Sequence, residues 1–358
     1  MERGIDKPND RLLVPSSLEE HLGALRSTTQ EIKQKFMGEL DKAIIGEEEA
    51  KLMLLCLAIS GAENAMSGIL YGPPGTGKSE LKKILPKMFG LDRNQVARVP
   101  HNLDLSPAQL VGKEEAVSKN RWERGVKLAE KIVVKHRAYI NENTKMLFFD
   151  EVNRTSPAAL NAALGILQDG SIEVYDDDNN LKEVNGFDLI LFAMNNYGTL
   201  FTSDLDPALI SRLSMGVVMG KKASGELSSA AQSIWGDINR TDQENEIRPL
   251  NVSEGINEIR ESIDIIPMSA TIIELGKEAT RACTESLKKI GYNNGDTRTA
   301  AQIKRVSRIL SLINNHTEVN EQDIKWATYY NLVAKLGALG IGEGGDPSST
   351  ARDIIAKI

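Results

Sequence analysis

The feature that most constrains this chain is a glycine-rich stretch between an apolar strand and a helix. Residues 72–79 fit the pattern G-x-x-x-x-G-K-S/T, follow the apolar residues 69–71 and precede a predicted helix, Glu80–Phe89. Backbone N–H groups of such a loop surround a phosphate, and the positive end of the following helix adds to their field. The stretch therefore predicts nucleoside triphosphate binding through Gly72, Pro73, Pro74, Gly75, Thr76, Gly77, Lys78 and Ser79.

Within this loop, two side chains have distinct expected tasks. Lys78 would reach the β- and γ-phosphates, and the Ser79 hydroxyl would bind Mg²⁺. The alternative is a Gly/Pro turn that carries Lys-Ser by chance, but the flanking strand and helix disfavour it.

Two carboxylates end a second apolar strand. Met146–Phe149 is a continuous apolar run, as expected for a strand buried on both faces of a parallel sheet, and Asp150 and Glu151 follow it. Ligands bind outside the carboxyl ends of such strands, so we expect both carboxylates beside the phosphate loop. Asp150 would hold the Mg²⁺ shell, and Glu151 would orient and polarise an attacking water.

Further polar residues end the next two elements. The apolar run Phe187–Met194 ends in Asn195 and Asn196, where an amide could touch the γ-phosphate or the lytic water, or could simply form a turn. The short helix 206–212 ends in Arg212. That arginine either complements the helix dipole or is offered to the γ-phosphate of an adjoining subunit.

Composition limits the possible partners. The chain has 43 Lys and Arg against 50 Asp and Glu, a net charge of −7, which argues against a surface that is basic as a whole and coats nucleic acid or an acidic membrane. Cys56 and Cys283 lie far apart, so neither a disulfide framework nor a zinc site is indicated and the reducing cytoplasm is expected. No apolar run is long enough to span a membrane.

One segment departs from this acidic balance. Residues 113–145 contain nine Lys or Arg against five Glu. We expect a solvated helical face there, with a partner-binding or DNA-binding surface as the alternative.

Helices are predicted on both sides of the nucleotide-binding core. Ser17 and Glu20 form a capping-box pattern that opens a helix, and Glu47–Ser60 is a second, apolar helix. A hairpin is expected within 171–184, and a connecting segment at 221–265 contains a helix around Gly225–Ile238. After Arg298, apolar residues recur at helical spacing: Ile303, Val306, Leu310 and Ile313.

The order of these parts resembles an AAA+ ATPase over about residues 41–340. Within that group, Asp150-Glu151-Val152-Asn153-Arg154 looks like the MoxR-type sequence Asp-Glu-Ile-Asn-Arg-Ala. The run Leu105–Gly112 resembles the segment that this family places between its two nucleotide motifs, and a helix followed by a hairpin fits as well. The sequence is therefore similar to the MoxR family of AAA+ ATPases.

The resemblance implies an α/β fold with two main domains. An AAA+ P-loop αβα sandwich with a parallel sheet would occupy residues 41–220, and a C-terminal α-helical lid domain would occupy 266–340. An N-terminal arm and helix would precede them at 1–40, and a flexible tail with a short helix would follow at 341–358.

The resemblance also implies residue roles and an assembly. It implies Mg²⁺-dependent ATP hydrolysis in a homo-hexameric ring, with Arg212 as the finger that reaches the neighbour's site. Asn196 would be the first sensor, with Asn195 as the rival assignment, and Arg298 would be the second sensor. Ile45 and Gly46 would add nucleotide contacts.

Three functions are open on this basis. The first is remodelling or maturation of a protein partner, often a von Willebrand factor A-domain protein in this family, and the second is a DNA-acting motor. A DNA-translocating hairpin tip should carry Lys or Arg, whereas Asp176, Asp177 and Asp178 would repel a phosphodiester, so a protein substrate is favoured. The third, a nucleotide-gated scaffold, would not need Glu151 and Arg212 together.

Overall fold

The computed structural model describes most of the chain. The described residues are 16–44, 46–61, 66–100, 102–123, 126–135, 138–176, 178, 180–195, 205–220, 247–293, 295–341 and 346–358. Ile45, Asn196 and the helix expected around Gly225–Ile238 lie outside them.

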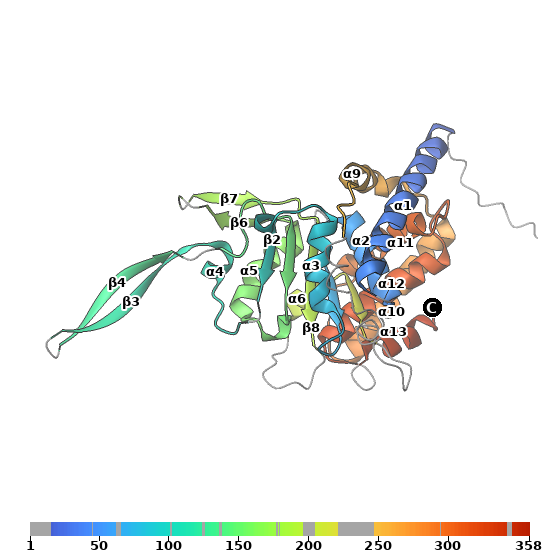
Figure 1. Ribbon diagram of the computed structural model, residues 1–358. Helices are drawn as coiled ribbons and strands as arrows, with labels where there is room; N and C mark the ends of the chain where they lie inside the picture. The colour runs from blue at the N-terminus through green and yellow to red at the C-terminus, as the bar shows by residue number, and fades with distance from the viewer. Residues whose placement is uncertain are drawn as a thin grey trace, which may run out of the picture.

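A five-stranded sheet forms the centre of the molecule (Figure 1), and all its pairings are parallel, in the order β2-β5-β8-β1-β9. The strands are β1 (Gly68–Tyr71), β2 (Val96–Val99), β5 (Met146–Phe149), β8 (Leu189–Met194) and β9 (Met215–Val218). All residues of β1, β5, β8 and β9 are buried, which explains their uninterrupted apolar sequences. The predicted α/β fold with a parallel sheet is confirmed.

The register of the sheet brings three strand ends to one edge. Tyr71 pairs with Met194, and Phe149 pairs with Phe192, so β1, β5 and β8 end near one another. The residues that follow these strands are Gly72, Asp150 and Asn195. The predicted convergence of the phosphate loop, the carboxylate pair and an asparagine at one edge therefore follows from the strand register.

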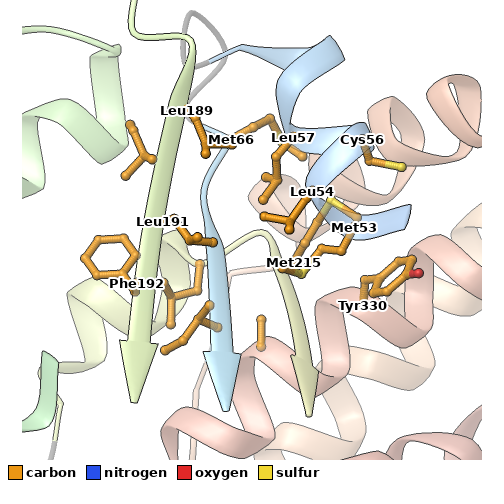
Figure 2. Packing of buried hydrophobic residues seen from close by; sticks show 14 of the residues in the cluster. Met53, Leu54, Cys56, Leu57, Met66, Leu189, Leu191, Phe192, Met215 and Tyr330 are labelled. Carbon is orange, nitrogen blue, oxygen red and sulfur yellow. The ribbon is translucent and has the colours of Figure 1, made fainter. Parts of the chain in front are cut away.

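Helices cover the sheet from segments before, between and after its strands. The first of them are α1 (Ser16–Ala43), α2 (Glu48–Ser60), α3 (Lys78–Met88), α4 (Pro107–Val111), α5 (Pro157–Asp169) and α6 (Pro207–Arg212). Helix α2 is buried almost all round, because it contacts the sheet on one side and later helices on the other. Figure 2 shows its Met53, Leu54 and Leu57 beside the strands, with Tyr330 of a later helix close by.

The C-terminal region is mainly helical, as predicted. Its helices are α9 (Ser253–Ser262), α10 (Ala270–Lys289), α11 (Asp296–Ile313), α12 (Glu321–Ala338) and α13 (Pro347–Ile355). Helix α12 packs along β9 so closely that a Cβ on Gly216 would lie 2.5 Å from the Ala334 Cα. Gly337, near the end of α12, faces the Tyr71 ring, where a Cβ would lie 2.5 Å from a ring carbon.

The basic segment is where the sequence-based prediction is wrong. Residues 114–135 form a long antiparallel hairpin, β3 (Glu114–Glu123) paired with β4 (Val126–Lys135), rather than a helix. The reason lies in the β-branched residues of β4, including Ile132, Val133 and Val134, which favour strands over helices. The hairpin projects away from the sheet (Figure 1). The second hairpin, β6 (Ile172–Tyr175) with β7 (Leu181–Val184), forms as predicted.

Candidate functional site

The loop between β1 and α3 has the backbone conformation that its glycines predict. Gly72, Gly75 and Gly77 have φ of 149°, 82° and 91°, a region that glycine adopts without strain. A Cβ on Gly72 would lie 2.6 Å from the Met219 carbonyl oxygen, whereas a Cβ on Gly75 or Gly77 would meet open space. The loop is thus packed against β9 at its start and open at the point where a phosphate would approach.

Lys78 lies inside this loop. Its Nζ donates hydrogen bonds to the carbonyl oxygens of Gly72, at 2.6 Å, and Pro73, at 2.8 Å. Burial lowers the pKa of Lys78 to about 8, although the charges of Asp150 and Glu151 act in the opposite direction. The lysine is therefore held at the centre of the loop, with both acidic residues near enough to affect its ionisation.

Asp150 and Glu151 end β5 as predicted, but each has a cationic partner that the sequence analysis missed. Asp150 forms an ion pair with Lys82, which lies one turn after Lys78 on α3. Arg154 Nη1 lies 3.1 Å from Glu151 Oε2. The first partner could have been found from its i, i+4 spacing to Lys78, and the second from the Asp-Glu-x-x-Arg run.

Glu151 is held in a costly conformation at the edge of the sheet. Its φ of 43° lies in the left-handed region, which is uncommon for a residue with a side chain. The buried Asn195 donates its Nδ2 hydrogen to Glu151 Oε1 over 2.7 Å. Asn195 and Arg154 thus contact different oxygens of one carboxylate and fix its orientation.

These residues fit ATP with Mg²⁺. The Ser79 side chain is exposed in the first turn of α3, and the Asp150 carboxylate is partly exposed, so both oxygen donors are accessible. Mg²⁺ prefers oxygen ligands and is usually held by one or two protein groups together with substrate phosphates. Within the described residues no group of three or more His, Cys, Asp or Glu could hold a metal ion, so the fit depends on bound phosphates.

The residue after Gly46 is connected to the loop through the segment that follows β9. Glu47, the next residue, accepts a hydrogen bond from the backbone N–H of Gly220 at 2.8 Å. A Cβ on Gly220 would collide with the Thr76 methyl group, so the segment after β9 is in contact with the phosphate loop.

Arg212 and Arg298 lie near each other, because Arg298 contacts the residue before Arg212. Arg212, at the end of α6, donates to the Ala208 carbonyl at 2.8 Å and to Gln168 Oε1 at 2.6 Å. Arg298, in the first turn of α11, donates to the Ser211 hydroxyl at 3.1 Å. Burial lowers the pKa of Arg212, and the nearby charge of Arg298 lowers it further.

Among the described residues, neither arginine donates a hydrogen bond to residues 72–79. By these contacts, the predicted site residues fall into two groups. Lys78, Ser79, Asp150, Glu151 and Asn195 gather at the sheet edge, and Arg212 gathers with Arg298. Gln168, which holds Arg212, belongs to the second group, and nothing in the sequence indicated it.

Known proteins are similar to this chain in fold and in part of its sequence. Residues 67–213 match the family described as "AAA domain (dynein-related subfamily)". The ClpB chaperone of Agrobacterium fabrum is 26% identical over 178 residues, which are 47% of this chain and 19% of ClpB. The ClpB chaperone of Meiothermus ruber is 27% identical over 177 residues, which are 45% of this chain and 18% of that protein. The chain thus spans about a fifth of the length of the curated relatives that it matches.

A solved structure extends the likeness of the fold to nearly the whole chain. A candidate ATPase from Cytophaga hutchinsonii superposes with a TM-score of 0.66 at 20% identity, covering 96% of this chain and 97% of that one. In the described part of this chain, no helix is both long and apolar enough to cross a bilayer.

Proposed function

We propose that this chain, an AAA-type ATPase over residues 67–213, hydrolyses ATP between the subunits of a ring and so remodels or matures a protein partner. The observation that carries the proposal is that Arg212 and Arg298 are held by residues of α5 and α6 and not by the phosphate loop. Arginines held in this way are suited to complete the site of a second copy. A hexamer in the manner of the MoxR family is the expected assembly.

Each residue of the first group has a role in this reaction. Lys78 would turn its N–H groups from the Gly72 and Pro73 carbonyls to the β- and γ-phosphates. Ser79 and Asp150 would hold the Mg²⁺ that accompanies ATP, and that ion would neutralise developing phosphate charge. Glu151 would accept a hydrogen bond from the attacking water, and Asn195 keeps that carboxylate in place.

Asn195 takes the sensor role in this proposal, because its hydrogen bond connects the end of β8 to Glu151. Asn196, which the family resemblance made the first sensor with Asn195 as its rival, lies outside the described residues and remains the other candidate. Ile45 remains a predicted nucleotide contact together with Gly46.

The second group would act on the neighbouring subunit. Two guanidinium groups that are already close would be stabilised by a shared anion, and the γ-phosphate of a neighbour is such an anion. Arg212 would be the finger, and Arg298 would act beside it rather than on the loop of its own chain.

A protein partner fits the surface features better than DNA does. Asp176 and Asp178 lie at the tip of the β6–β7 hairpin and would repel a phosphodiester backbone. The relatives that match in sequence are named chaperones. A von Willebrand factor A-domain protein is the expected partner class, in the cytoplasm. The DNA-motor alternative is favoured by the basic segment 113–145, which contains the β3–β4 hairpin, and by the β6–β7 hairpin before the strand that ends in Asn195, a feature that the resemblance shares with related helicases.

The test compares the wild-type chain with the Glu151→Gln variant. The variant should bind ATP as the wild type does, assemble into a stable ring when measured by light scattering, and hydrolyse ATP at least ~10²-fold more slowly. Normal hydrolysis by the variant would contradict the assigned role of Glu151. In the same assay, stimulation of the wild-type activity by DNA would overturn the protein-substrate proposal in favour of the DNA motor.

A further inference from the structure

A buried polar network lies directly behind Arg212, and the roles assigned so far do not use it. Its central residue is Lys335 on α12, whose side chain is fully buried. Its Nζ donates to Asn331 Oδ1 at 2.6 Å, to Thr299 Oγ1 at 3.0 Å and to Gln302 Oε1 at 3.3 Å. An ammonium group has three N–H donors, and here each has an acceptor.

The network continues from these acceptors to the backbone at Arg212. Gln302 donates its Nε2 hydrogens to the Arg212 carbonyl, at 3.3 Å, and to the Ser214 hydroxyl, at 3.1 Å. Asn331 donates to the Ser214 carbonyl at 3.1 Å and to Gln302 Oε1 at 2.7 Å. Three segments that are far apart in sequence, at 212–214, 299–302 and 331–335, are thereby connected.

Packing alone does not require this network. The contacts of α12 with β9 and with α11 already bury apolar side chains, including Val217, Val306 and Val333. Burying a lysine amine disfavours its charge, and the pKa of Lys335 falls to about 7 for this reason. An apolar residue of similar volume would avoid that cost, so the lysine contributes something other than core volume.

The positions joined by the network are informative. Gln302 binds the backbone carbonyl of Arg212 itself, and Thr299 directly follows Arg298 in the first turn of α11. A buried network with all its members satisfied specifies one arrangement of the segments it joins, because every alternative arrangement leaves a polar group unpaired. Here the specified arrangement is that of α6 against the start of α11.

We infer that Gln302, Asn331 and Lys335 are positioning residues that fix Arg212 and Arg298 relative to each other, so that both guanidinium groups are presented together to the neighbouring subunit. This inference rests on the proposed function, since it assigns the network to the subunit that supplies the arginines. The network does not touch the phosphate loop of its own chain, so its loss should impair the neighbour's hydrolysis and leave nucleotide binding intact.

The experiment uses the 358-residue chain in mixed assemblies. Lys335→Met removes the amine and keeps the volume of the side chain. Gln302→Glu is the second variant; it keeps the contact to Lys335 but cannot donate to the Arg212 carbonyl. Thr328→Val is the matched control, because Thr328 is equally buried on α12 and its hydroxyl bonds only the Ile324 carbonyl of its own helix.

Assembled alone, Lys335→Met and Gln302→Glu should bind ATP with affinity within about twofold of the wild type and turn over about 10²-fold more slowly, the effect of a finger misplaced by about 1 Å. Mixing either variant with Lys78→Ala chains should restore turnover, because those chains lack a working loop but supply well-placed arginines. Thr328→Val should keep wild-type turnover.

The outcomes separate this inference from the function on which it rests. Wild-type turnover by both variants, or loss that Lys78→Ala chains do not restore, would overturn the positioning role. If Lys335→Met does not fold, the same two outcomes for Gln302→Glu decide the question. An Arg212→Ala variant is measured in parallel: if it keeps full turnover, the intersubunit site itself is wrong, independent of the network.

Discussion

The two groups of site residues in this chain are built in different ways. The loop group (Lys78, Ser79, Asp150, Glu151 and Asn195) lies at the ends of three neighbouring parallel strands. Asp150 and Asn195 directly follow β5 and β8, and Lys78 ends the loop that follows β1, so the register of the sheet brings these segments together. The arginine group consists of Arg212, Arg298 and Gln168. It depends on side chains from α5, α6, α11 and α12, which meet only when the C-terminal helices pack on β9.

Because the two groups are built differently, substitutions in them should impair hydrolysis in different ways. A substitution in the loop group removes a chemical function from the chain's own site. In the proposed ring, a substitution behind the arginine group would move an intact chemical function away from the site of the neighbouring chain. Mixed assemblies of two variants distinguish these two cases.

Lys78→Ala should abolish ATP binding, because the variant loses the only lysine that lies inside the loop while the loop backbone is retained. Equilibrium binding of a fluorescent ATP analogue measures the effect. Lys83→Ala is the control, since Lys83 is an exposed lysine on the same helix that pairs with Glu80. Equal binding by the two variants would contradict the placement of the phosphate loop.

Arg212→Ala should leave ATP binding unchanged and lower turnover by about 10³-fold, the low end of the range for a transition-state arginine. Adding Lys78→Ala chains should restore turnover, because each supplies the missing finger. Arg212→Lys keeps the charge but loses the planar fork, and we expect it to remain well below the wild type. Failure of every mixture to recover activity would assign Arg212 a structural role within its own chain.

Asn195→Ala should lower turnover by about 10²-fold with little change in ATP affinity, because the Glu151 carboxylate loses the donor that orients it. Lys78→Ala chains should not restore this activity, in contrast to Arg212→Ala, since Asn195 belongs to the loop group. Recovery in the mixture would place Asn195 on the arginine side instead. Steady-state turnover and ATP affinity are the two measurements.

Lys335→Met should change how stability depends on pH. The folded pKa of Lys335, about 7, is below its ordinary value of 10.5, so between these values the unfolded chain holds a proton that the folded chain lacks. Wild-type stability relative to the variant should therefore rise with pH above about 7, by at most ~1.4 kcal/mol per pH unit, and stay constant below it. Urea unfolding of both proteins between about pH 6 and pH 9 measures this, and parallel curves would show that Lys335 keeps its ordinary pKa.

Much of the loop group was predictable, because its signals are local. The glycines of residues 72–79 predict the loop conformation directly. The apolar run Met146–Phe149 predicts a buried strand, and the two residues after it must lie at the carboxyl edge of the sheet, where ligands bind. For the arginine group, the sequence indicated Arg212 and Arg298 as separate candidates but not that they lie together. Nothing near Arg212 or Arg298 in the sequence indicates that they lie together, and Gln168 and Lys335 become relevant only through tertiary packing.

The error at 114–135 has a related cause. The helix was predicted there from the charged residues alone, and charge does not indicate whether a segment pairs as a strand. The β-branched residues of β4 favour a strand instead. Pairing over ten residues on each strand also requires a partner strand, and that is a property of two segments rather than one.

The contact between Tyr71 and α12 has a consequence for how the two groups of site residues are connected. Tyr71, the last residue before the loop, donates its hydroxyl to the Ala334 carbonyl at 2.6 Å, and Ala334 is the neighbour of Lys335. One helix thus touches both the strand that leads to a chain's own nucleotide and the network behind the arginines that it offers outward. If the proposed ring forms, a change at a chain's own nucleotide site has a direct structural route to the arginines of the same chain.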